Sequence, residues 1–250
     1  MNIRDENVLR ELNLYPLWVR RDAPAAEALE PSAPVAETQA VCRLGGGEAD
    51  TQQSAMGIVA LNPSYISSLD WNELKEKVHA CTACKLRAGC TQTVFGVGDE
   101  SAEWLFVGEG PGADEDAQGE PFVGQAGKLL DNMLAAIKLK RGNNVYIGNI
   151  VKCRPPNNRT PEPDEIATCM PYLQQQIALI KPKLIVALGK TAATSLLGRE
   201  ATLGSLRGSV HDFHGTPLIV TYHPAYLLRS PAEKAKAWQD LCFAVQRMSE

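Results

Sequence analysis

The chain has 250 residues, of which 44% are hydrophobic, and its 25 Lys and Arg against 29 Asp and Glu give a formal net charge of −4. This length and composition allow one large or two small globular domains with a hydrophobic core. No stretch approaches about eighteen consecutive apolar residues and the N-terminus is charged, so the sequence predicts a cytoplasmic protein with neither a membrane span nor a secretory signal.

The negative charge is concentrated in the N-terminal quarter. Residues 1–66 contain five Lys or Arg and nine Asp or Glu, whereas residues 67–250 contain twenty of each class. A neutral region can still carry a local basic strip. The overall charge is therefore weak evidence against a nucleic-acid partner.

Residues 1–66 are predicted to form an N-terminal extension. Residues 23–40 contain seven Ala and three Pro without apolar periodicity, which indicates a flexible linker. Before it, "VLRELNLYPLWVRR" is short, apolar and aromatic, and is either a first helix packed on the core or a peptide that docks on a protein partner. Because Pro16 interrupts any long amphipathic helix, we favour packing on the core.

Residues 67–250 are predicted to form one catalytic domain in which strands and helices alternate. Continuous apolar runs predict four strands, at 104–109, 144–151, 183–189 and 216–224. Helical spacing and capping residues predict helices at 68–80, 124–139, 162–180, 190–198 and 231–248. This alternation predicts an α/β fold with a central, mainly parallel four-stranded sheet covered on both faces.

Three predicted loops lie where such a sheet binds ligands, outside the carboxyl ends of its strands. They are "GEGPGADED" (108–116), "NIVKCRPPNNR" (149–159) and "HPAYLLR" (223–229). A glycine-rich turn after a strand usually cradles phosphate, but the four acidic side chains of the first loop would repel one. The sequence therefore predicts a different ligand for this loop.

The seven cysteines lie at positions 42, 81, 84, 90, 153, 169 and 242. Their odd number, in a chain without a predicted export signal, argues against a disulfide framework and for thiols or metal ligands. Two residues separate Cys81 from Cys84, and fifteen residues separate Cys153 from Cys169. These two pairs predict a four-thiolate site, which suits either a structural zinc or a 4Fe-4S cluster.

The remaining cysteines are assigned to other roles. Cys90 is an alternative metal ligand because it follows Cys84 closely in the chain. Cys42 and Cys242 are expected to be buried free thiols, since Cys242 lies within an apolar helical face.

Several motifs occur in an order and at a spacing that resemble the iron-sulfur, or family 4, uracil-DNA glycosylases of the uracil-DNA glycosylase superfamily. They are "CTACKLRAGC", "VGEGPGADEDAQGEPFVGQAGKLLDNML", "NIVKCRPPNNRTP", "CMPYL", "ALGKTAATSLLG", "GSLRG" and "TYHPAYLLR". The resemblance covers about residues 69–248. It implies a three-layer α/β/α sandwich and a 4Fe-4S cluster held by Cys81, Cys84, Cys153 and Cys169. It also implies hydrolysis of the N-glycosidic bond of uracil in DNA, which leaves an abasic site for base excision repair.

The same resemblance implies which residues meet the base. Gly110 would contact uracil through its backbone, and Glu109 and Glu115 would shape the pocket or hold its water. Phe122 would stack on the uracil ring. Asn149 would form paired hydrogen bonds with the uracil edge, because an amide offers both a donor and an acceptor.

The last motif would supply the leaving-group donor and the DNA contacts. His223 would donate to uracil O2 as negative charge builds on the departing base. Tyr226, Leu227 and Leu228 would wedge into the duplex where the base left, and Arg229 would meet a phosphate. Carboxylates in the first loop would suit the positive charge that develops on the deoxyribose.

Two site assignments stay open. Other members of the superfamily place an aspartate and a tyrosine, which position water and exclude thymine, where this chain has Gly110 and Gly112. The water-positioning residue is therefore unassigned, and we expect Glu115 to exclude thymine. Asn157 or Asn158 is an alternative reader of the base edge.

The implied partner is uracil-containing DNA, single- or double-stranded, bound by a monomer, with a protein partner for the N-terminal extension as a further option. A glycosylase acting on another deaminated base, such as hypoxanthine, is a rival interpretation. A non-catalytic module that carries the cluster is another, although the presence of Asn149, Phe122 and His223 argues against it.

Overall fold

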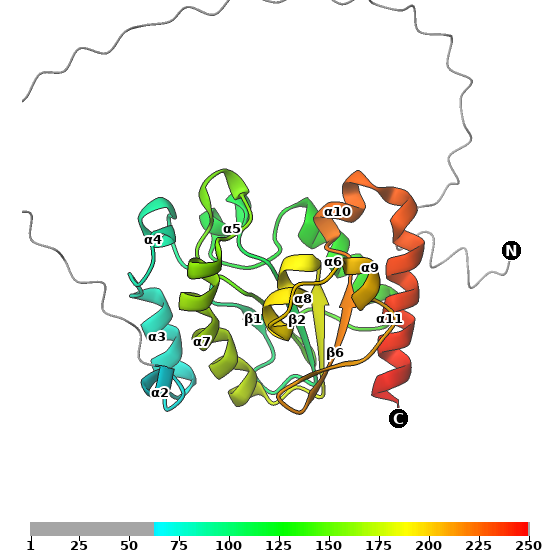
Figure 1. The fold of residues 1–250 in the computed structure, drawn as a ribbon, viewed down its shortest axis with the longest axis horizontal. Helices are drawn as coiled ribbons and strands as arrows, with labels where there is room; N and C mark the ends of the chain where they lie inside the picture. The colour runs from blue at the N-terminus through cyan, green and yellow to red at the C-terminus, as the bar shows by residue number, and fades with distance from the viewer. Residues whose placement is uncertain (1–62, 250) are drawn as a thin grey trace, which may run out of the picture. The chain divides into compact units, whose positions relative to one another are not determined.

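The computed structural model describes residues 63–249, which form a six-stranded sheet with helices on both faces (Figure 1). Its strands are β1 (Val97–Gly98), β2 (Trp104–Gly108), β3 (Val145–Asn149), β4 (Leu184–Leu188), β5 (His211–Phe213) and β6 (Thr216–Thr221). They are ordered β1-β3-β2-β4-β6-β5. The four inner strands are parallel, whereas β1 and β5 pair antiparallel at the two edges.

The predicted α/β fold is confirmed, but the predicted number of strands is wrong. The four predicted strands are the inner ones, and each is shorter than its apolar run because the last residues of the run turn into a loop. The edge strands β1 and β5 have only two and three residues. Segments this short show no alternation of apolar and polar residues that could be recognised in the sequence.

Longer helices follow the predictions closely. They are α3 (Trp71–His79), α6 (Gln125–Ala136), α7 (Pro163–Ile180), α8 (Lys190–Leu197) and α11 (Lys234–Met248). The predicted helix at 231–248 begins with a separate turn of 3-10 helix, η2 (Pro231–Glu233). Within residues 63–249, no helix is both long and apolar enough to cross a membrane.

Short helices were not predicted. They are α2 (Pro63–Ile66), α4 (Leu86–Gly89), α5 (Ala113–Gln118), η1 (Pro156–Asn158), α9 (Leu203–Leu206) and α10 (Pro224–Arg229). Two of them, α5 and α10, lie at the same end of the sheet in Figure 1.

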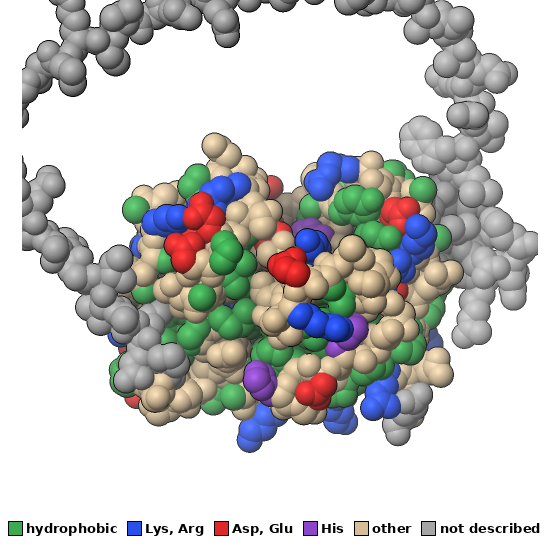
Figure 2. Space-filling model, in the orientation of Figure 1, with side chains coloured by type: hydrophobic (Ala, Val, Ile, Leu, Met, Phe, Trp, Pro, Cys, Tyr) green, Lys and Arg blue, Asp and Glu red, His purple; other side chains and the backbone are tan. Residues whose placement is uncertain are grey.

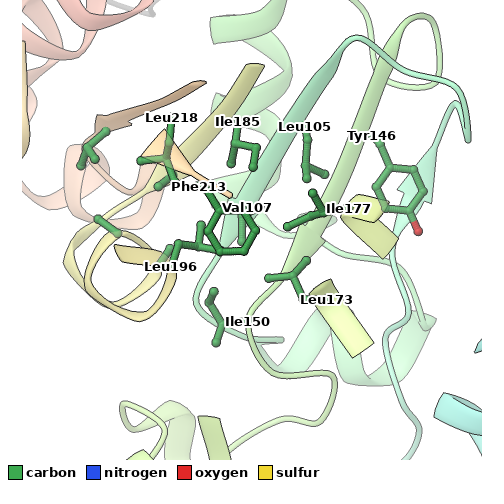
Figure 3. Packing of buried hydrophobic residues seen from close by; sticks show 14 of the residues in the cluster. Leu105, Val107, Tyr146, Ile150, Leu173, Ile177, Ile185, Leu196, Phe213 and Leu218 are labelled. Carbon is green, nitrogen blue, oxygen red and sulfur yellow. The ribbon is translucent and has the colours of Figure 1, made fainter. Parts of the chain in front are cut away.

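Alternate strand residues face opposite sides of the sheet, so each strand contributes to two hydrophobic cores. On one side, strand residues such as Leu105, Val107 and Ile185 pack against Leu173 and Ile177 of α7 (Figure 3). Burying a side chain of this size contributes about 1.5–3 kcal/mol. The layer of α7, α8 and α9 therefore lies on this face.

The other side of the sheet packs on α6 and α11. Phe106 and Val186 of the strands contact Leu130 and Met133 of α6 and Leu241 of α11 in a second buried cluster. Together the two cores give the three-layer α/β/α arrangement that the sequence resemblance implied.

The N-terminal end of the described chain belongs to the folded domain. Ile66 of α2 is 1% exposed and packs with Leu74 and Val78 of α3 and Tyr172 of α7. The predicted boundary after residue 66 therefore falls a few residues too late. The rest of the predicted extension and linker lies outside the described residues.

Candidate functional site

A pocket of about 460 Å³, which we call the main pocket because the predicted site residues line it, lies at the carboxyl ends of the parallel strands. Its lining includes Glu109 and Gly110 after β2, Asn149 at the end of β3, and His223 after β6. The chain passes from β2 to β3 on one side and later to β4 on the other side of β2. Such a reversal of strand order opens a crevice at the carboxyl edge of the sheet.

The segment after β2 is a turn followed by helix α5, not the loop that its glycines and proline suggested. Gly112 is the N-cap of α5, and the backbone N–H of Gly112 donates to a Glu115 carboxylate oxygen at 3.1 Å. The other Glu115 oxygen accepts from the N–H groups of Val123 (3.0 Å) and Gly124 (3.1 Å). Glu115 thus joins α5 to the segment that carries Phe122.

A second acid of this segment also binds backbone and not ligand. Asp116 is 4% exposed, and its carboxylate accepts from the N–H groups of Thr91 (2.9 Å) and Gln92 (3.3 Å). Asp116 therefore stabilises the backbone at Thr91 and Gln92 and does not line the main pocket. Among the described residues, Glu109 has no hydrogen-bond donor to its carboxylate, although it lines the main pocket.

The ring of Phe122 forms one wall of the main pocket. Its position is fixed by hydrogen bonds to the backbone of residues 121 and 122. Phe122 adopts a left-handed conformation (φ 56°) and is 6% exposed. The Arg141 guanidinium donates to the carbonyl oxygens of Pro121 (2.8 Å) and Phe122 (2.7 Å), and also to Asp131 (3.0 Å). A side chain on Gly127 would collide with the same Phe122 carbonyl.

Asn149 presents an unused hydrogen-bond acceptor in the main pocket. Its side chain is 2% exposed, and its Oδ1 atom has no hydrogen-bond partner. Gly108, paired with Asn149 across the sheet, leaves room for it, since a Cβ on Gly108 would lie 2.5 Å from Oδ1. Leaving a buried amide oxygen without a hydrogen bond costs free energy. Such an oxygen is typical of a binding site in which the ligand supplies the donor.

The alternative base reader fits less well. Asn158 lines the main pocket, but its Oδ1 accepts a hydrogen bond from Arg154 at 2.7 Å. Asn157 is absent from the lining of the pocket. Asn149 is therefore the better candidate of the three amides.

His223 is the N-cap of α10, and this position fixes its tautomer. The backbone N–H of Ala225 donates to His223 Nδ1 at 3.1 Å, so the proton of the neutral ring is on Nε2. Burial, with a smaller contribution from the charge of Arg229, lowers the pKa of His223 to about 4, although the charge of Glu115 opposes this shift. The ring is therefore a neutral N–H donor at physiological pH, with its centroid 5.5 Å from that of Phe122.

Four cysteines line a second cavity, which we call the thiol cavity: Cys81, Cys84, Cys153 and Cys169. The N–H of Lys152 donates to Cys169 Sγ at 3.3 Å. Burial raises the pKa of Cys84 and of Cys153, and raises that of Cys169 to about 12. Neighbouring cysteines also raise the pKa of these three thiols, because a thiolate disfavours negative charge beside it.

The other described cysteines lie apart from this lining. Cys90 is close enough to Cys153 to raise its pKa, but it does not line the thiol cavity. Cys242 is exposed on α11, so the prediction of a buried thiol there is wrong. Cys42 lies outside the described residues. Within residues 63–249, no three His, Cys, Asp or Glu side chains are placed to hold a single metal ion.

Comparison with known proteins settles the family. The family model of the uracil DNA glycosylase superfamily matches residues 95–242. The chain belongs to this superfamily. It is 46% identical over 165 residues to the type-4 uracil-DNA glycosylase of Thermotoga maritima, covering 65% of this chain and 85% of the relative.

Two archaeal relatives give similar values. The type-4 uracil-DNA glycosylase of Pyrobaculum aerophilum is 42% identical over 181 residues, covering 69% of this chain and 92% of the relative. That of Archaeoglobus fulgidus is 44% identical over 174 residues, covering 66% and 86%. The family resemblance predicted from the motifs is confirmed.

In this member of the superfamily, the residues expected to enter DNA divide between surface and core. Tyr226 and Leu228 of α10 are 40% and 44% exposed, and Tyr226 and Arg229 line the main pocket. Leu227 is 1% exposed and packs in the core with α6 and α11. The wedge role predicted for Leu227 therefore does not fit, because the turn of α10 directs this side chain inward.

The exposed Tyr226 is supported from behind by a stack of side chains. Its ring is parallel to that of Tyr222 at 5.4 Å, and the Arg207 guanidinium lies 4.5 Å from the Tyr222 ring centroid. Arg207 is held by a two-pronged ion pair with Asp240 (2.7 and 2.9 Å). On the face shown in Figure 2, basic and acidic side chains are interspersed and do not form one basic strip.

Lys152 is a buried charged residue that the sequence analysis did not single out. It is 2% exposed, and its Nζ donates to the Asn149 carbonyl (2.9 Å) and to Gln176 Oε1 (2.6 Å). Burial lowers the pKa of Lys152 to about 8, and nearby Cys169 opposes this shift. A single lysine in a motif gives no sign that its side chain is buried.

Proposed function

We propose that the protein excises uracil from DNA by hydrolysing the N-glycosidic bond, with the main pocket as the site for a uracil flipped out of the helix. The unpartnered Oδ1 of buried Asn149 carries this proposal. Uracil offers an N3–H donor to this oxygen and its O4 to the amide N–H of Asn149. Cytosine presents the reverse pattern, so the fixed amide selects against it.

The ring of the base would lie against Phe122. Base stacking on an aromatic ring is worth about 1–3 kcal/mol. The left-handed backbone of Phe122 and its contacts with Arg141 hold this surface in place before the base arrives. Gly110 lines the pocket without a side chain and would contact uracil through its backbone.

His223 would act on the leaving group. As the bond between C1′ and N1 lengthens, negative charge builds on uracil O2, and the neutral His223 ring donates its Nε2–H to this oxygen. A donor already aligned in a buried site stabilises the transition state more than the ground state. Because the pKa of His223 is about 4, the ring stays neutral and donates a hydrogen bond without first having to bind a proton.

Glu109 would orient the attacking water. Its carboxylate is free of donors among the described residues, whereas both Glu115 oxygens are engaged by backbone N–H groups. Water adds to C1′, and its proton is taken up by the released uracil anion. Glu115 would instead set the wall of the pocket, where we expect it to exclude the thymine methyl group.

The thiol cavity would hold a 4Fe-4S cluster. Cys81, Cys84, Cys153 and Cys169 line it and supply the four thiolates that such a cluster takes from a protein. A structural zinc takes the same four ligands, and the resemblance of the motifs to the iron-sulfur family favours the cluster. The cluster would stabilise the fold around these cysteines; no step of uracil excision is assigned to it.

DNA would be held at the rim of the main pocket. Tyr226 and Leu228 would fill the gap left by the flipped base, and Arg229 would contact a phosphate. The described residues that line the main pocket run from Glu109 to Arg229, so we assign the catalytic domain to the chain from residue 63 onward.

The experiment is excision from an oligonucleotide with a single uracil, followed by alkali cleavage and separation on a gel. We expect a cut strand with uracil and none with thymine or cytosine at the same position, while Asn149→Ala controls for contaminating enzymes. A cut at hypoxanthine but not at uracil would support the rival glycosylase. An iron-loaded protein that cuts neither would contradict the proposed function.

A further inference from the structure

Lys152 lines the thiol cavity and contacts Asn149, which lines the main pocket. Its side chain donates to the carbonyl of Asn149, the proposed reader of the base edge, at 2.9 Å. Its backbone N–H donates to Cys169 Sγ at 3.3 Å, and the next residue, Cys153, lines the thiol cavity. One residue therefore lies between the two sites.

The ammonium group of Lys152 has no carboxylate partner among the described residues. Its two acceptors, the Asn149 carbonyl and the Gln176 amide, are both neutral. A buried charge is costly unless an opposite charge lies nearby. Cysteines that bind metal do so as thiolates, so a loaded thiol cavity places negative charge beside this lysine.

Gln176 fixes the direction of the lysine. Its amide nitrogen donates to the carbonyl of Phe95 (3.0 Å) and to the Tyr146 hydroxyl (3.2 Å). With both amide N–H groups occupied, the Gln176 oxygen must face Lys152. The ammonium is therefore held at one point and cannot follow a displaced Asn149.

We propose that Lys152 is a positioning residue that couples the two sites, by balancing the negative charge of the cysteine thiolates and by holding the backbone of Asn149 for base recognition. This inference rests on the proposed function of Asn149 and of the cysteines. It assigns the cluster an influence on base recognition through a side chain of the protein, without any chemical step on the cluster.

The test compares the full-length, iron-loaded protein with Lys152→Met, which keeps the length and volume of the side chain but removes its charge. Lys152→Gln is a second neutral variant in case the first does not fold, and exposed Lys75→Met is the matched control. Three properties are measured. They are the rate at which a chelator bleaches the visible absorbance of the cluster, its reduction potential, and the affinity for DNA that contains an uncleavable 2′-fluoro-deoxyuridine.

We expect both neutral variants to lose the cluster about tenfold faster and to have a more negative reduction potential, because a nearby positive charge favours the added electron. Affinity for the uracil analogue should fall about tenfold, the effect of losing one hydrogen bond from a charged donor. Affinity for undamaged DNA should not change. A fall in this affinity would show general damage to the fold and would contradict a positioning role.

Lys75→Met should match the wild type in all three properties. Wild-type values in both Lys152 variants would overturn the proposal, and a change at only one of the two sites would overturn the coupling. Failure of the wild type to excise uracil would overturn the proposed function instead. The cluster measurements on Lys152 would still be interpretable in that case.

Discussion

The segment that follows β3 lines both the main pocket and the thiol cavity in part, but the polar groups of these two sites are in different states. In the main pocket, backbone N–H groups occupy Glu115 and Asp116, while Asn149 keeps an acceptor unused. In the thiol cavity, burial raises the pKa of Cys84, Cys153 and Cys169, which favours the protonated thiols when no metal is bound. The side chains of the main pocket are already in position before a ligand binds. The cysteines of the thiol cavity become metal ligands only when they lose their protons to bind metal.

This difference shows where substitutions should be severe. The thiol cavity depends on four sulfurs acting together, because each iron needs its own ligand. The main pocket divides its work among separate contacts, each made with a different part of the base. A substitution in the thiol cavity should therefore abolish cluster binding altogether. A substitution in the main pocket should reduce activity only in part.

Cys153→Ala should have the largest effect. Without this sulfur the cluster lacks one ligand, and we expect loss of bound iron and of soluble protein, measured by visible absorbance and iron content. Exposed Cys242→Ala is the control and should keep the iron. If Cys90→Ala loses the cluster and Cys153→Ala retains it, the assignment of ligands is wrong.

His223→Ala should slow the chemical step by about a hundred- to a thousandfold, the usual result of removing one donor to a developing negative charge. Because the charge on O2 is absent in the ground state, affinity for the uncleavable uracil analogue should change little. Single-turnover rates and binding measurements separate the two effects. Exposed His79→Ala should behave as wild type, and an undiminished rate in His223→Ala would exclude the leaving-group role.

Arg141→Ala should weaken excision by about tenfold, because the Phe122 carbonyl loses a charged hydrogen-bond donor. The measurement is kcat/KM on a uracil oligonucleotide. Arg141→Lys should not restore it, since an ammonium cannot reach both carbonyls as the planar fork does. Exposed Lys140→Ala is the neighbouring control, and an effect as large as that of Arg141→Ala would point to general charge loss.

Removal of residues 1–62 should have the smallest effect. The shortened chain keeps every described residue that lines the main pocket and the thiol cavity, and it keeps Ile66, which packs in the core. We expect excision within about twofold of the full chain, a change of less than about 0.5 kcal/mol. A folded but inactive shortened chain would place part of the active site in the extension.

The inner strands and long helices could be predicted because their apolar residues recur with the period of the element. Helix α5 was missed, since the glycines and proline before Ala113 indicate a turn. The available signal was Glu115 three residues after Gly112, since a glutamate at this position can accept from the backbone N–H of the N-cap residue. Leu227 was misplaced because two adjacent leucines look alike until the turn of α10 directs one of them inward.

The sequence motifs predicted which residues line the main pocket, including Asn149 and His223. They did not predict that Asn149 Oδ1 lacks a hydrogen-bond donor or that the tautomer of His223 is fixed, because both depend on the surrounding structure. Arg141 and Lys152 were not predicted because each donates a hydrogen bond to a backbone carbonyl. Every residue has such a carbonyl, so the sequence does not indicate which one is the acceptor.

The claim that Asn149 reads the uracil edge is tested most directly by binding. The affinities of wild type and Asn149→Ala are compared for oligonucleotides with 2′-fluoro-deoxyuridine or 2′-fluoro-deoxycytidine at one position, so that no cleavage occurs. We predict that the wild type prefers the uracil analogue by at least about tenfold and that Asn149→Ala loses this preference, since one good pair of hydrogen bonds discriminates by about 1–3 kcal/mol. An unchanged preference in Asn149→Ala would contradict the account.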